Sequence, residues 1–110
     1  MSFYLYQLSY STDATKAMIT KPTDREAAAR KLAEAAGGKM HHLFFCFGRY
    51  DVVCLLEAPN DAVAMAVALA VGASGTTSGA MTTKLFTASE AMAAMTLAGK
   101  STGAYKSPMA

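Results

Sequence analysis

Three segments of the chain carry large apolar side chains at consecutive positions, and this feature limits the possible folds more than any other. Their aromatic and aliphatic residues, uninterrupted by proline, predict β-strands over residues 3–10, 40–47 and 51–57. Successive side chains of a strand point to opposite faces, so a sheet packed on one side only should alternate apolar with polar residues. In the first segment Tyr4 and Tyr6 share one face. Phe3 and Leu5 share the other, so both faces of the predicted sheet are apolar.

Capping and breaking residues divide the rest of the chain into further elements. Thr23 and Glu26 have the spacing of a capping box and predict the start of a helix. Gly37 and Gly38 predict that this helix ends after Ala36. Further helices are predicted over residues 14–20, 61–73 and 88–98, and a fourth strand over residues 80–86.

The main elements follow the order strand, helix, strand, strand, helix, strand. This order predicts an α+β protein with the ferredoxin-like βαββαβ fold: a four-stranded antiparallel sheet with both main helices on one face. The helix over residues 88–98 is an addition at the C-terminal end. We expect residues 1–98 to form one domain, and the polar residues 99–110, which contain glycine and proline, to form a flexible tail.

Only one face of such a sheet can pack on the chain's own helices. We expect a second copy of the sheet to cover the other face, giving a homodimer or a larger closed ring. Tyr4, Tyr6 and one stripe of residues 40–47 are expected at this interface. In the alternative, the C-terminal helix, with Met92 and Met95, folds back over the open face.

Charge and hydropathy narrow the setting in which the chain works. Its net charge is only +2 and its basic residues are scattered along 110 residues, so no nucleic-acid partner is expected. The longest apolar run, residues 62–73, falls short of the roughly 18 residues that a membrane span needs. The first residues lack the pattern of a secretory signal. We therefore expect a cytoplasmic protein without a membrane partner, in which Cys46 and Cys54 are reduced thiols.

A turn near the middle of the chain carries a family resemblance. Gly48-Arg49-Tyr50-Asp51 precedes the apolar residues 52–56 and then Glu57-Ala58-Pro59-Asn60-Asp61. Together with residues 31–39 and 68–75, this pattern is similar to the GYD domain family over about residues 3–96. The resemblance implies a small bacterial or archaeal domain of the dimeric α/β-barrel kind, and it implies no particular activity.

The turn and the two histidines each have a structural and a functional interpretation. Gly48 and Arg49 complete a tight turn that Tyr50 and Asp51 anchor, and we favour this structural role over a pocket lined by the last two. His41 and His42 are adjacent on a predicted strand, so they should point to opposite faces. Without a metal-binding spacing nearby, we expect no metal and no cofactor.

A small-molecule site is the functional hypothesis that these residues favour. An aromatic ring with a polar tip suits a ligand cavity, so the candidate binding residues are Tyr4, Tyr6, His41, His42, Tyr50 and Asp51. No catalytic motif is present, so we favour a homo-oligomeric binding or accessory domain over an enzyme. One alternative is a cofactor-light oxygenase or isomerase that uses histidine and tyrosine in the cleft between sheet and helices. Another is a purely structural assembly protein. Whether Cys46 and Cys54 touch across the hairpin is left open.

Overall fold

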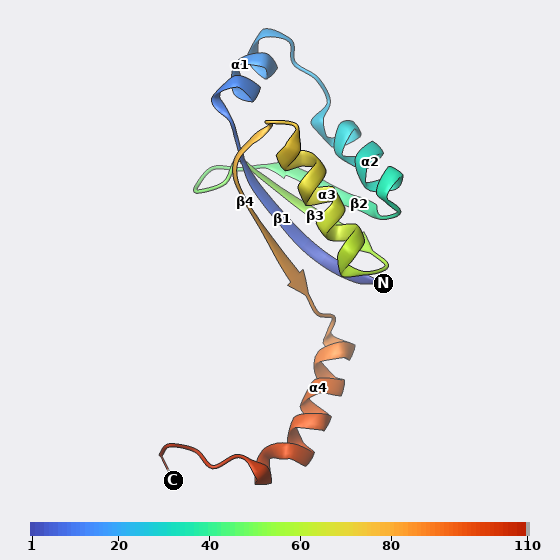
Figure 1. Ribbon diagram of the computed structural model, residues 1–110, viewed down its shortest axis with the longest axis vertical. Coiled ribbons are helices and arrows are strands. Elements are labelled where there is room, and N and C mark those ends of the chain that lie inside the picture. The colour runs from blue at the N-terminus through green and yellow to red at the C-terminus, as the bar shows by residue number, and fades with distance from the viewer. Residues whose placement is uncertain (110) are drawn as a thin grey trace.

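The computed structural model describes residues 1–109 and shows one sheet, of which one face is covered by helices (Figure 1). The strands are β1 (Ser2–Tyr10), β2 (Lys39–Phe45), β3 (Val52–Ala58) and β4 (Thr77–Leu85). The helices are α1 (Thr12–Thr20), α2 (Arg25–Ala36), α3 (Asp61–Ala73) and α4 (Ala88–Ser101), followed by a 3₁₀ turn at Thr102–Ala104.

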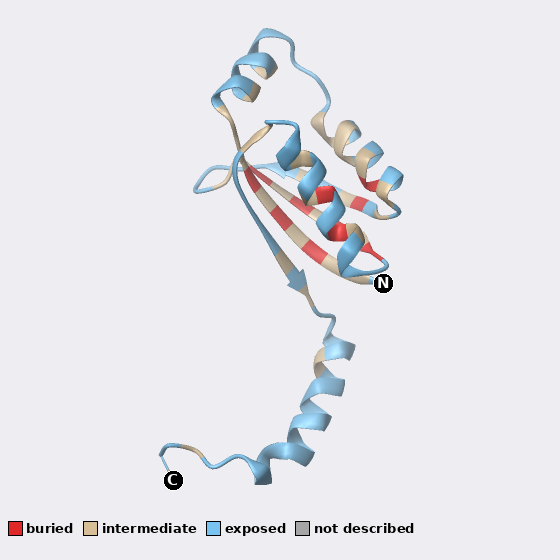
Figure 2. Cartoon of the chain, in the orientation of Figure 1, coloured by how far each residue is buried: buried red, intermediate tan, exposed pale blue. Residues whose placement is uncertain are grey.

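The sheet is antiparallel with the strand order β2-β3-β1-β4, which confirms the predicted ferredoxin-like fold. Both α2 and α3 cross the same face (Figure 1). The two central strands, β1 and β3, therefore lie beneath the helices. Every second residue of β3 is buried, and burial alternates in the same way along the middle of β1 (Figure 2).

The start of α2 differs from the predicted capping box. Asp24, not Thr23, caps the helix, and its carboxylate accepts a hydrogen bond from the Ala27 amide at 3.0 Å. Glu26 instead turns toward the sheet, so it is not available to close a capping box. The predicted end is confirmed: Gly37 adopts a φ of 97°, a left-handed conformation that glycine allows without steric cost.

The aromatic stripe of β1 packs on the chain's own helices. Tyr4, Tyr6 and Leu8 are buried on the helix-covered face, together with Val52 and Leu56 of β3. The expectation that Tyr4 and Tyr6 meet another subunit is therefore wrong. Both stripes of β1 are apolar, so alternation alone does not tell which of them faces the helices.

The opposite face of the sheet is bare in the single chain, and we name it the open face. Its side chains include those of Phe3, Leu5, Gln7, His41, His42, Phe44, Val53, Leu55, Glu57, Met81, Thr83 and Leu85. Phe44 and Met81 are 60% and 50% exposed. The alternative cover is also wrong, because α4 extends away from the sheet and packs on none of its strands (Figure 1).

The C-terminal helix is longer than predicted and begins with a true capping box. The Thr87 hydroxyl accepts from the Glu90 amide at 3.1 Å, and the Glu90 carboxylate accepts from the Thr87 amide at 2.9 Å. The helix continues to Ser101, three residues into the segment predicted as a tail. Within residues 1–109, no helix combines the length and the apolar character needed to cross a membrane.

Candidate functional site

A partly enclosed cleft of about 240 Å³ lies between the sheet and the two helices that cover it. We name it the sheet–helix cleft. Its walls come from β1, β2 and β3 on one side and from α2 and α3 on the other. Most of the lining is apolar, and it includes Leu8, Ala29, Leu32, Val52, Val67 and Val71. Small apolar hollows with a few polar groups are typical of ligand sites.

Tyr6 is the predicted candidate that lines this cleft. Its side chain is 95% buried, with an exposed fraction of only 5%. Burial raises the pKa of its phenol, with a smaller contribution from Cys54, so the hydroxyl is protonated at neutral pH. Within residues 1–109 this hydroxyl has no hydrogen-bond partner. Every fully buried polar side-chain atom in these residues does have a partner, so the Tyr6 oxygen is not fully buried. The hydroxyl is therefore open to the cleft and free to donate to a bound molecule.

Cys54 lines the same cleft as a neutral thiol. Burial, with a smaller contribution from Glu26, raises the pKa of this thiol to about 11. A thiol with so high a pKa is a poor nucleophile at neutral pH. Its neighbour across the hairpin is Leu43, whereas Cys46 lies opposite Asp51 and is exposed. The two cysteines therefore do not form a cross-strand pair.

Arg25 and Tyr10 stand at one end of the cleft, and Arg25 was not predicted from the sequence as a site residue. Arg25 is the first residue of α2, and Tyr10 is the last residue of β1. A signal for Arg25 was present in the sequence. The first turn of a helix favours negative side chains, because its unpaired amides carry partial positive charge, so an arginine there is against the usual preference.

Tyr4 is placed at the other end of the helix-covered face and does not line the cleft. Its hydroxyl donates to Asp61 at the start of α3, and Lys84 of β4 binds the same carboxylate oxygen at 2.9 Å. The hydrogen bond to Asp61 is the main cause that raises the pKa of Tyr4. The same bond, followed by the one from Lys84, lowers the pKa of Asp61. This cluster ties α3 to two strands.

A β-bulge in β2 changes where the histidines point. Met40 pairs with Leu56 and His42 with Leu55, so His41 is an extra residue between them. The His41 ring reaches Glu57 on the open face, at 2.8 Å from Nε2 to Oε1, and lies beside Phe3. The expectation of opposite faces is therefore wrong.

His42 lies on the same face as His41. Its ring stacks on Phe44, with a centroid separation of 5.7 Å, and its strand partner is Leu55. Both histidines are thus on the far side of the sheet from the cleft.

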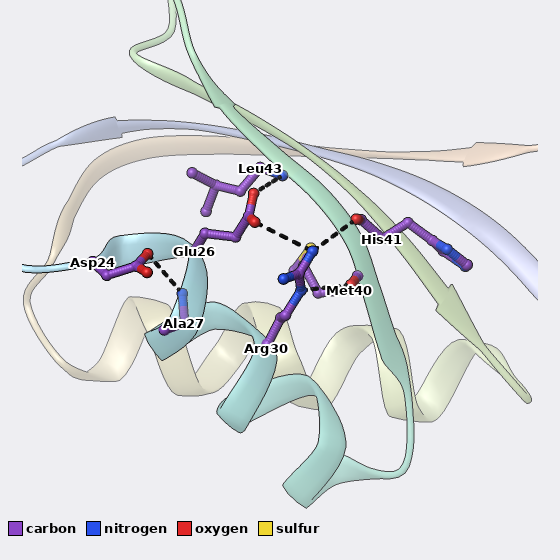
Figure 3. A network of polar contacts seen from close by, with 7 residues as sticks. All are labelled: Asp24, Glu26, Ala27, Arg30, Met40, His41 and Leu43. Atoms are coloured by element: carbon purple, nitrogen blue, oxygen red, sulfur yellow. Dashed lines mark hydrogen bonds and ion pairs between the residues drawn. The ribbon is translucent and has the colours of Figure 1, made fainter.

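Polar contacts from α2 hold the bulge in place (Figure 3). The Arg30 guanidinium donates to the carbonyls of Met40 and His41, at 3.4 and 3.1 Å. Glu26 binds Arg30 at 3.2 Å and accepts from the Leu43 amide at 3.1 Å. Helix α2 therefore fixes both the wall of the cleft and the bulge that turns the histidines away from it.

Asp51 ties the turn before β3 to the end of β1. The Asp51 carboxylate accepts from the Tyr10 amide at 2.9 Å, and its own amide donates to the Leu8 carbonyl at 2.8 Å. Gly48 adopts a φ of 111° in this turn, and the Arg49 guanidinium lies 5.7 Å from the Tyr50 ring. Neither Tyr50 nor Asp51 lines the cleft.

The described residues contain no group of three or more histidine, cysteine or acidic side chains that could hold a metal ion. The chain matches no curated protein and no solved structure. The family model of the GYD domain does match it, over residues 4–95, and with most of the chain covered the protein belongs to the GYD domain family.

Proposed function

We propose that this chain is a homodimeric domain that binds a small, mainly apolar molecule in the sheet–helix cleft. The observation that carries the proposal is the cleft itself. Protein interiors are close-packed, with few voids larger than a water molecule. Against this close packing, the cleft leaves about 240 Å³ of partly open, mainly apolar space between the sheet and the helices. An engineered apolar cavity of about 150 Å³ is known to hold benzene, so this cleft has room for one substituted ring.

The chemistry of the lining supports binding rather than catalysis. The cleft offers an apolar bed, the free hydroxyl of Tyr6 and the neutral thiol of Cys54. The catalytic alternative needs a histidine in this cleft with a shifted pKa. Among the residues that line it, none is a histidine, aspartate or glutamate, and His41 and His42 lie on the open face. No observation therefore favours an acid–base reaction here.

The test of ligand binding is a titration with a neutral single-ring probe, benzyl alcohol, followed by amide chemical shifts. We expect the shifts to concentrate on residues that line the cleft. Ala29→Leu fills the cleft from α2 and should remove them, and Ala70→Leu offers a second filling position on α3. Ala35→Leu makes the same change on an exposed position of α2 and should leave them unchanged. Equal binding by the filled and control variants would contradict the proposal.

Dimerisation through the open face is the second part of the proposal. Four strands spaced about 4.8 Å apart, with about seven residues each at about 3.3 Å, give a flat area of roughly 450 Å². Two such faces would bury roughly 900 Å² in total, without the extra area of protruding side chains. This is close to the roughly 1,000 Å² of buried surface that a specific interface needs. Leu5 and Leu55 lie directly opposite each other at the centre of this face, where they would be excluded from water.

Aspartate at the centre of the open face should break such a dimer. Light scattering at micromolar concentration is expected to give twice the 11.5 kDa chain mass for the natural protein. Leu55→Asp should shift it to the monomer, because a carboxylate would be buried without a partner. Ile19→Asp is the matched control, since this exposed aliphatic residue lies on α1. A natural protein that is monomeric would refute the dimer, and a dimer without ligand binding would favour the structural assembly alternative.

A further inference from the structure

One cation, Arg25, lines the sheet–helix cleft, and a second, Lys21, lines the hollow next to it. Arg25 is the charged residue of the cleft lining. A neighbouring hollow beside α1 shares Arg25, Tyr10 and Thr76 with the cleft and adds Lys21. These three shared residues form the wall between the two hollows. No aspartate or glutamate lines either hollow.

Arg25 has no carboxylate partner of its own. Within residues 1–109 the ion pairs join other residues, and neither Arg25 nor Lys21 takes part in one. The acidic neighbours of Arg25 in sequence are already engaged: Asp24 caps α2, and Glu26 binds Arg30 and the backbone of β2. An arginine at the edge of an apolar cleft, at the positive end of a helix and without a counter-ion, is poised for an anion.

The other titratable groups of the cleft carry no charge at neutral pH. Burial raises the pKa of Tyr6, of Tyr10 and of the Cys54 thiol, and Arg25 opposes the shift of Tyr10 only in part. A ligand in the cleft therefore meets one positive charge at one end and neutral surface elsewhere. The hydroxyls of Tyr6 and Thr76 add donors that suit an acceptor on the ligand.

We propose that the ligand is a compact apolar molecule, about one ring in size, that carries a single carboxylate held by Arg25. This inference rests on the proposed binding function and names its ligand class. The guanidinium of arginine presents two parallel N–H donors that match the two oxygens of a carboxylate. The ring would lie among the aliphatic side chains of the cleft, and the carboxylate at its Arg25 end. Lys21, in the adjoining hollow, adds longer-range attraction.

The test compares phenylacetate with phenylacetamide, which has nearly the same shape and no charge. By calorimetry at neutral pH, we expect the natural protein to bind phenylacetate about tenfold tighter or more. Arg25→Gln should remove this preference by weakening phenylacetate about tenfold while leaving phenylacetamide within about twofold. Lys31→Gln removes one charge from an exposed position of the same helix, outside the cleft, and should change neither probe.

The outcomes distinguish a wrong ligand class from a cleft that binds no ligand. If both probes bind equally well and both are lost in Ala29→Leu, the cleft is a binding site but the carboxylate assignment is wrong. If Arg25→Gln and Lys31→Gln weaken phenylacetate equally, the effect is one of net charge and the assignment is again wrong. If phenyl phosphate binds more tightly than phenylacetate, the acidic group is not a carboxylate. If no probe binds at millimolar concentration, both the ligand class and the binding function fail.

Discussion

The buried thiol of Cys54 should make the protein less stable in alkaline solution. Burial raises the pKa of Cys54 from its ordinary 9.0 to about 11. As the pH rises, the thiol loses its proton in the unfolded chain before it does so in the folded protein. Ionisation therefore stabilises the unfolded state relative to the folded state. Stability from this group is therefore complete below pH 9 and declines as the pH rises toward 11. At about pH 10 the loss is roughly 1.4 kcal/mol, and it approaches about 2.7 kcal/mol above pH 11.

Urea unfolding at constant protein concentration, from about pH 7 to about pH 10, measures this loss. Tyr6 and Tyr10 also have raised pKa values, so they contribute further loss at the upper end of the range. The difference between the natural protein and Cys54→Ala isolates the thiol. Cys54→Ala should be less stable at pH 7, because truncation leaves a small cavity, but it should lose about 1.4 kcal/mol less by pH 10.

Cys46→Ala is the matched control, because Cys46 is exposed. It should retain the full alkaline loss of the natural protein. If Cys54→Ala and Cys46→Ala show the same dependence of unfolding free energy on pH, the argument from burial is refuted. A simple thiol reagent offers a second measurement: Cys46 should react in the folded protein, whereas Cys54 should react only at the rate at which the protein opens.

Three further predictions concern contacts outside the cleft. Tyr4 and Lys84 lower the pKa of Asp61, so the stabilisation is present above the unfolded value of about 3.9 and is lost as the pH falls through the folded pKa. Urea unfolding below about pH 5 should show a smaller acid loss in Asp61→Asn than in the natural protein, and an equal loss would contradict this. Arg30→Met should lower the unfolding free energy by about 1 kcal/mol, because two carbonyls of the bulge lose a donor; an unchanged urea midpoint would contradict it. Thr87→Ala should reduce the helical signal in circular dichroism without moving the urea midpoint of the sheet, since α4 packs on no strand.

The order of elements was predictable because each depends on local chemistry. Strand and helix periodicities, Gly37 at the end of α2 and the tight turn at Gly48 each act within a few residues. Which face of β1 meets the helices was not predictable, because both stripes are apolar. The structure resolves this with a contact far apart in sequence: the Tyr4 hydroxyl reaches Asp61 at the start of α3, which no aliphatic side chain could do.

The bulge in β2 was not predictable either, and the placement of the histidines depends on it. A strand without the bulge would send His41 and His42 to opposite faces. The extra residue, His41, depends on Arg30, which is eleven positions away in sequence and on another element. Local pattern carries no information about such a contact. Tertiary contacts of this kind decide which side chains share a site, even when the elements themselves are assigned correctly.

Arg25 illustrates how a site can be recognised when no motif marks it. Its positive charge lies in the first turn of α2, where the helix dipole favours a negative side chain. The neighbouring carboxylates do not compensate, because Asp24 caps the helix and Glu26 pairs with Arg30. Local and global preferences usually agree in a natural sequence, and positions where they disagree tend to be functional. The disagreement is resolved if an anion completes the site, because the ligand then supplies the charge that the chain withholds. One bound molecule would give Arg25 a counter-ion and place its apolar part in the sheet–helix cleft.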